Sequence, residues 1–136
     1  MRDNLVLAAS NLPLPDSACF GYAWVGSDLY FCDGQDVEVP QLDLGEDGAY
    51  VRVLCDSEKV SIGTDFFGFG KVYLYQSGHN WAVGRSMMGL ADYASSSGWP
   101  LTKDFTQLQG WFLRGNTIIG GQLTSFRTVF DEISLV

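Results

Sequence analysis

The sequence predicts a single α+β domain, residues 1–136, in which antiparallel β-sheets come first and two helices follow. Up to residue 84, aromatic and β-branched runs occur in pairs that are separated by short polar connectors, as in β-hairpins. Between residues 86 and 114, apolar residues recur every three or four positions instead, which is typical of helices. Because no strand alternates with a helix, the pattern argues against a parallel, doubly wound sheet.

The strands can be placed in order along the chain. A short apolar run, 5–9, predicts a first strand that ends at the proline-containing loop 10–16. Three hairpins are expected next, in which 19–25 pairs with 29–32, 49–55 with 60–64, and 71–76 with 80–84. We therefore expect either two antiparallel β layers or one strongly curved sheet.

Two helices are predicted in the C-terminal half. Ser86 is a suitable N-cap for a helix over 86–97, which Gly98 and Pro100 would end. A second helix is expected over 104–114. The apolar stripes consist of Met87, Leu90, Ala91 and Ala94 in the first helix, and of Phe105, Leu108, Phe112 and Leu113 in the second. We expect both stripes to be buried and both helices to cover one face of the sheet.

The charge balance excludes one class of partner. The chain has 16 acidic residues against 8 Lys and Arg, a formal net charge of −8, so it lacks the basic surface of a nucleic-acid binder. Eleven of the acids lie in residues 1–58, where they give a local net charge of −9. The densest part of the acidic loop 28–58 consists of Asp33, Asp36, Glu38, Asp43, Glu46 and Asp47. Their spacing does not match a calcium-binding loop, so we expect a solvated acidic surface there.

The cellular location is expected to be the cytoplasm. Cys19, Cys32 and Cys55 are odd in number and form no C-x-x-C pair, which argues against a disulfide framework. A chain of this length can bury a core without disulfides or a structural metal. No apolar run approaches the roughly 18 residues of a membrane span, and we expect neither a secretion signal nor membrane partners.

No catalytic, cofactor-binding or metal-binding residues are predicted. The single histidine, His79, lies in a polar hairpin turn, where solvation is its expected role. One histidine and three scattered cysteines have no metal-ligand spacing. The glycine-rich stretch 63–71 does not match a phosphate-binding loop, because Lys71 begins a β-type run rather than a helix. We expect a turn there, with Phe66, Phe67 and Phe69 packed locally.

Residues 64–75, together with 81–86, resemble the hairpin of the N-terminal glutaminase-like domain of asparagine-synthetase-like proteins, a class II glutamine amidotransferase domain of Ntn type. Residues 108–115 are similar to the second helix of that family, and 124–136 to its exit segment. The resemblance covers roughly residues 58–136. It implies a reduced Ntn-type sandwich and a place as the N-terminal part of a longer asparagine-synthetase-like protein.

The departures from that family concern its chemistry. Its glutaminases use an N-terminal cysteine nucleophile, whereas this chain begins Met1-Arg2 and lacks the family's substrate-binding motifs and its pyrophosphate loop. The resemblance therefore implies a non-catalytic scaffold or regulatory domain that is associated with an ATP-dependent, amide-forming enzyme. One alternative is a hydrolase or transferase that uses an internal cysteine, for which Cys32 beside Asp33 is the candidate. Another is a module that binds a small ligand or a partner.

The last segment, 125–136, is apolar on more than one side. We expect it either to dock back onto the domain or to be covered by a downstream synthetase-like domain or a second copy of the chain.

Overall fold

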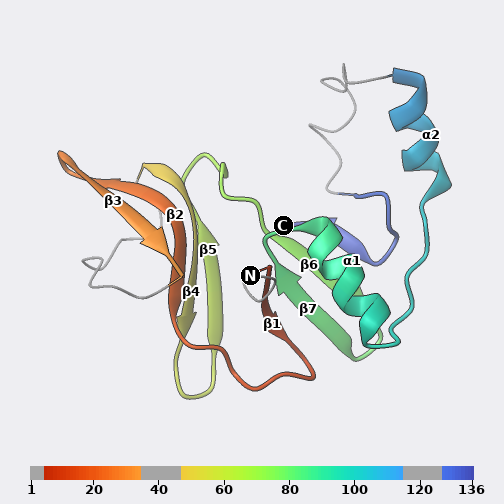
Figure 1. Cartoon of the computed structure of the whole chain (residues 1–136), viewed down its shortest axis with the longest axis horizontal. Coiled ribbons are helices and arrows are strands. Elements are labelled where there is room, and N and C mark those ends of the chain that lie inside the picture. The colour runs from red at the N-terminus through yellow and green to blue at the C-terminus, as the bar shows by residue number, and fades with distance from the viewer. Residues whose placement is uncertain (1–4, 35–46, 115–126) are drawn as a thin grey trace.

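The computed structural model describes residues 5–34, 47–114 and 127–136, which form two antiparallel four-stranded sheets and two helices (Figure 1). This confirms the predicted α+β class. Sheet A has the strand order β1-β7-β6-β8 and contains β1 (Val6–Ala9), β6 (Tyr73–Ser77), β7 (Asn80–Gly84) and β8 (Ile133–Leu135). Sheet B has the order β3-β2-β4-β5 and contains β2 (Ala18–Val25), β3 (Asp28–Asp33), β4 (Gly48–Cys55) and β5 (Val60–Thr64).

The three predicted hairpins are all present. They join β2 to β3, β4 to β5, and β6 to β7, each in antiparallel register. Two-residue turns close the first and the third of them, since Val25 pairs with Asp28, and Ser77 with Asn80. A further pairing of β2 with β4 joins two hairpins into sheet B. The local pattern of apolar runs and polar turns thus accounts for most of both sheets.

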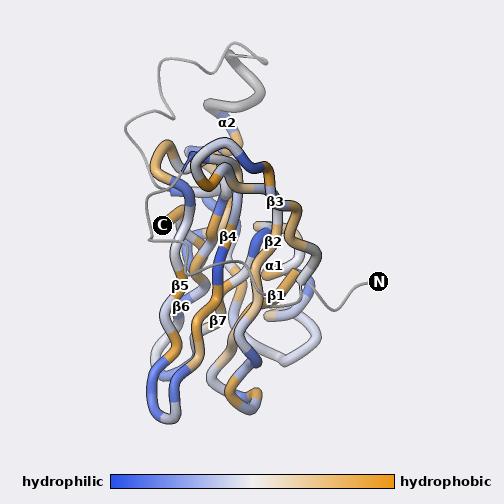
Figure 2. The backbone as a smooth tube through the Cα atoms, turned by 90° about the vertical axis from the view of Figure 1, so that its left-hand side faces the viewer, coloured by the Kyte–Doolittle hydropathy of each residue, from blue (hydrophilic) through white to orange (hydrophobic). Residues whose placement is uncertain are grey.

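The inner faces of the two sheets pack against each other. Leu7 of β1 and Val83 of β7 come from sheet A, and they meet Phe20, Val51 and Val53 of sheet B in one apolar cluster. In Figure 2, hydrophobic positions run along the strands and a hydrophilic turn lies at the bottom of the view. The facing sides of the two sheets therefore share a two-layer β core, the first of the two arrangements expected.

Helix α1 (Met87–Ser96) covers the other face of sheet A. The hydroxyl of Ser86 accepts a hydrogen bond of 3.1 Å from the backbone N–H of Gly89, which confirms the predicted N-cap. Leu90, Ala91 and Ala94 are buried, as predicted, against a cluster that includes Tyr75 of β6. The layers therefore run from α1 through sheet A to sheet B.

Helix α2 (Phe105–Arg114) forms where it was predicted, but it does not cover a sheet. Asp104 caps it: its Oδ1 accepts hydrogen bonds from the N–H groups of Thr106 and Gln107. Phe105 is 76% exposed, and Figure 1 shows α2 away from both sheets, so the expectation that both helices cover one face is wrong for this one. Periodicity reveals an apolar stripe without showing what, if anything, covers it.

The predicted burial of the rest of the α2 stripe is confirmed only in part, at Leu108. Leu108 is half-buried, and the side chains of Phe112 and Leu113 lie outside the described residues. Neither helix in the described ranges is long and apolar enough to cross a membrane.

The C-terminal segment docks back onto sheet A within the described range 127–136, which is one of the two arrangements expected. Strand β8 pairs with β6, and Ile133 is 1% exposed in the cluster beneath α1. The hydroxyl of Thr128 donates a bond of 2.7 Å to the carbonyl of Ile133. On the other side, the Glu132 carboxylate accepts a bond of 2.8 Å from the N–H of Thr102. Residues 127–136 are therefore part of the fold.

Candidate functional site

One end of sheet B carries a group of large aromatic side chains that are exposed to solvent. They come from the β2–β3 hairpin and from the connection between β5 and β6. We call this group the aromatic surface, and it consists of Tyr22, Trp24, Phe31, Phe66, Phe67 and Phe69. Large apolar side chains that are exposed in such numbers at one end of a sheet are candidates for a site of interaction.

The hairpin part of the aromatic surface is an extension of the inner face of sheet B. Phe20, Tyr22 and Trp24 alternate along β2 and therefore lie on the same face. Phe20 is 8% exposed beneath sheet A, whereas Tyr22 is 41% exposed. Across the sheet, Tyr22 pairs with Phe31, and their ring centroids are 6.4 Å apart. The inner face thus continues past the area that sheet A covers.

The second part is the phenylalanine loop, which we define as residues 65–70. Its anchor is Asp65, which is 3% exposed. The Asp65 carboxylate accepts hydrogen bonds from three backbone N–H groups, those of Gly70 at 2.6 Å, Phe69 at 2.8 Å and Tyr50 at 3.3 Å. Gly68, with φ at 66°, turns the chain, and its N–H donates a hydrogen bond of 3.0 Å to the Asp65 carbonyl. The loop is therefore held in place from within.

The predicted turn is thus confirmed, although its phenylalanines are mostly exposed. Phe66 and Phe67 pack edge to face with centroids 5.2 Å apart, and Phe67 lies 6.0 Å from Phe69. Each of the three side chains nonetheless remains at least 66% exposed. Local contact with each other therefore leaves most of their area free for a partner.

These contacts favour the ionised form of the Asp65 carboxyl. Burial raises its pKa, but the three backbone hydrogen bonds outweigh that effect, and the pKa lies below its usual value. A carboxylate that is charged and fully hydrogen-bonded in this way fixes the loop backbone.

Topology places the hairpin and the phenylalanine loop at the same end of sheet B. Tyr22 pairs with Ala49 at the start of β4, and the next residue, Tyr50, is bonded to Asp65 just past the end of β5. In the upper part of Figure 1, the β2–β3 turn and the chain that leaves β5 lie at the same end of sheet B. The six aromatic residues therefore lie at one end of sheet B and come from two separate parts of the chain.

The charged neighbours of the aromatic surface are mainly acidic. Asp28, in the β2–β3 hairpin, and Asp47, just before β4, are both exposed. The carbonyl of Asp47 accepts a bond of 2.7 Å from the N–H of Trp24, which places this acid beside the surface. Lys71 follows the phenylalanine loop and is exposed as well.

Within the described residues, the histidine and the cysteines lie on different sheets. His79 is exposed at the β6–β7 turn of sheet A, whereas all three cysteines lie on sheet B. Cys19 is buried, and Cys32 packs against it on the face of sheet B that points away from sheet A. The half-buried Cys55 donates its thiol to the carbonyl of Asp56 at 3.5 Å.

Part of the acidic block lies within the described residues. Within the described ranges, no three or more His, Cys, Asp or Glu residues are arranged to hold a metal ion. Asp36, Glu38, Asp43 and Glu46 lie outside the described residues.

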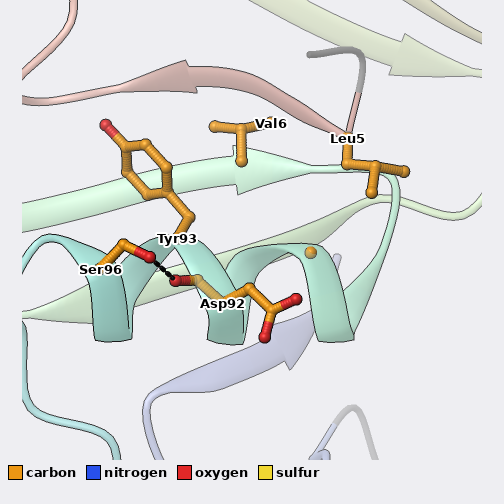
Figure 3. A pocket seen from close by; sticks show the side chains of 6 residues that line it. Leu5, Val6, Asp92, Tyr93 and Ser96 are labelled. Atoms are coloured by element: carbon orange, nitrogen blue, oxygen red, sulfur yellow. Dashed lines mark hydrogen bonds between the residues drawn. The ribbon is translucent and has the colours of Figure 1, made fainter. Parts of the chain in front are cut away.

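A pocket of about 240 Å³ lies between the start of β1 and helix α1 (Figure 3). It is lined by Leu5, Val6, Gly89, Asp92, Tyr93 and Ser96. The hydroxyl of Tyr93 donates to Asn11 Oδ1 at 2.6 Å, and that of Ser96 to the Asp92 carbonyl at 2.8 Å. In Figure 3 the Asp92 carboxylate points away from Val6 and Tyr93. With both hydroxyls engaged, the pocket offers a small, mainly apolar wall and no group of polar side chains that converge.

Comparisons with protein-family models, curated proteins and solved structures gave no significant match. The aromatic surface is therefore the site that the geometry of the chain itself singles out.

Proposed function

We propose that this chain is a non-catalytic interaction domain whose aromatic surface binds a protein partner. The observation that carries the proposal is the exposure of six large aromatic side chains on backbone that is already ordered by strand pairing and by the Asp65 hydrogen bonds. Aromatic residues dominate the binding energy of protein interfaces. Pre-ordered backbone also reduces the entropy that is lost when a partner binds.

The resemblance to the glutaminase-like domain supports a choice of partner. Residues 64–75, which carry part of that resemblance, include the phenylalanine loop. We propose that the partner is an asparagine-synthetase-like, ATP-dependent, amide-forming enzyme, either in the same chain or separate, and that the domain acts in the cytoplasm. Because residues 127–136 pack on sheet A, we place the contact on the aromatic surface rather than on the C-terminal segment.

Two measurements test this proposal. Titration calorimetry with the asparagine-synthetase-like protein of the same genome should show binding that the combined F66S, F67S and F69S variant loses. F105S is the matched control, because Phe105 is equally exposed but lies on α2. Glutamate release from glutamine should not exceed that of a heat-denatured sample. Equal binding by the triple variant, or glutamate release by the folded chain, would contradict the proposal.

A further inference from the structure

We infer that the aromatic surface receives an extended peptide segment in which Arg or Lys alternates with apolar residues, and that this segment adds as a fifth strand to the outer edge of β3. The inference rests on the proposed function and specifies the chemistry of the partner.

The first observation is the outermost position of β3 among the described strands of sheet B. Strand β3 is the first strand in the order β3-β2-β4-β5, and among the described residues only β2 pairs with it. Its outer N–H and C=O groups can therefore form a ladder with an incoming chain. Addition of a strand to an exposed edge is an established mode of peptide recognition.

The second observation is what an added strand would meet. Leu29 and Phe31 alternate along β3 on the face that carries Trp24 and Tyr22, with which they pair. Phe31 is 78% exposed at this edge. A neighbouring strand lies about 4.8 Å away, so its alternate side chains would contact Phe31 and Leu29 directly. The main chain would supply affinity, and the aromatic surface would select the side chains.

The third observation is a cation that already binds this face. The guanidinium carbon of Arg85 lies 4.5 Å from the centroid of the Phe20 ring. Phe20 precedes Tyr22 on the same face of β2, and no such cation lies over Tyr22, Trp24 or Phe31 in the described part of the chain. An Arg or Lys from the partner would repeat the Arg85 contact on these rings.

Charge decides against the other occupants. Asp28 and Asp47 border the hairpin part of the surface, Lys71 follows the phenylalanine loop, and the chain as a whole has a net charge of −8. An anionic membrane or a nucleic acid would be repelled, and a second copy of the chain would bring the same negative charge to the contact. A basic partner would be attracted by the acidic side chains and would form cation–π contacts with the aromatic rings.

The test uses the full 136-residue chain and a synthetic probe, an acetylated and amidated hexapeptide that alternates valine with arginine. We expect saturable binding, observed by calorimetry and by a change in tryptophan fluorescence that a W24F variant loses, and this binding should weaken as salt screens the charges. F31S should weaken binding by about tenfold. F105S should leave it unchanged. Thermal melts of both variants should match the parent protein, because both side chains are exposed.

Two further peptides separate the contributions. Replacing arginine by glutamate should abolish binding, and N-methylation of alternate backbone amides should do the same by removing the ladder donors. If either peptide binds as tightly as the valine–arginine hexapeptide, the inference is overturned. The same holds if F31S and F105S lose affinity for the hexapeptide to the same extent. Binding to anionic lipid vesicles, or dimerisation through Phe31, would overturn it as well. If the synthetase-like protein binds through the phenylalanine loop while the arginine peptide does not bind, the inference fails and the proposed function stands.

Discussion

The carboxylate of Asp65 accepts a 2.6 Å hydrogen bond from the backbone N–H of Gly70, and this contact closes the loop that displays Phe66, Phe67 and Phe69. The same carboxylate reaches the N–H of Tyr50, so one side chain joins the loop to β4. The phenylalanine loop is therefore anchored by a buried carboxylate.

Replacing Asp65 by Ala should destabilise the domain by about 2–4 kcal/mol, because three backbone N–H groups lose their acceptor near the core. Urea denaturation followed by circular dichroism measures the change. D56A is the control, since the exposed Asp56 carboxylate accepts a hydrogen bond from the N–H of the adjacent Ser57. Its loss should cost less than about 0.5 kcal/mol. A D65A variant as stable as D56A would contradict this anchoring role.

Stability should fall at acid pH. The pKa of Asp65 is depressed in the folded state. Burial raises the pKa of Glu132, but the hydrogen bonds that Glu132 accepts from Thr102 outweigh this effect, so the pKa of Glu132 is depressed as well. Because protons bind these groups more tightly in the unfolded chain, their stabilisation is present above about pH 4 and is lost as pH falls through the folded pKa. The combined D65N and E132Q variant should show a flatter stability curve between about pH 5 and pH 2. An unchanged slope would show that other carboxyls control acid unfolding.

Tyr75 should contribute a hydrogen bond as well as packing. Its hydroxyl donates a hydrogen bond of 2.6 Å to the carbonyl of Pro100. Its ring stacks on the Trp99 ring, with the centroids 5.3 Å apart. Y75F should cost about 1 kcal/mol in the free energy of unfolding while the ring contact is kept. Y22F, at an exposed tyrosine, serves as the control. Equal stability of Y75F and Y22F would mean that the Pro100 bond is not formed in solution.

Burial raises the pKa of the Tyr75 hydroxyl. The side chain of Ser77 lowers this pKa by hydrogen bonding, the charge of Glu132 raises it, and the net direction is upward. Because the pKa of Tyr75 is higher in the folded than in the unfolded chain, its neutral hydroxyl stabilises the fold below about pH 10. This stabilisation is lost as the pH rises through the folded pKa. Ultraviolet titration of the parent protein and Y75F should therefore differ by one tyrosine that ionises late. Identical titration curves would contradict the burial of this hydroxyl.

Ile133→Glu should unfold the domain rather than separate subunits. Ile133 is 1% exposed within the cluster that contains Leu90 and Tyr75, so a charge there should cost at least about 3 kcal/mol. V136E is the control, because Val136 is mostly exposed at the chain end. The measurement is thermal unfolding of both variants together with light scattering. A folded, stable I133E protein would show that β8 does not dock as described.

Local sequence signals were sufficient for the hairpins and for the helix boundaries. They predicted the Ser86 cap and the buried stripe of Leu90 and Ala94, because turns, caps and periodicity depend on near neighbours in the chain. They could not identify β8 as a strand, because its pairing with β6 joins residues about sixty positions apart. Phe105 was misplaced because an apolar stripe does not reveal whether another element covers it.

The candidate site was harder to predict for a related reason. Alternation of Tyr22 and Trp24 along β2 signals one apolar face, and Phe20 belongs to the same pattern. Whether each residue is covered depends on how far sheet A extends, which is set by packing between distant segments. The role of Asp65 likewise depends on Tyr50, fifteen residues away. Only the glycine-rich turn itself was visible as a local signal.

The most direct test of the central claim is a site-specific crosslink. Phe67 is replaced by a photoreactive benzoyl-phenylalanine in the full chain, which is then irradiated with the synthetase-like protein of the same genome, and Phe105 carries the same group in the control. Both positions are exposed, but only Phe67 belongs to the aromatic surface. We predict a one-to-one adduct from position 67 and none from position 105. No adduct at position 67, or equal adducts from both positions, would contradict the assignment of the aromatic surface as the partner-binding site.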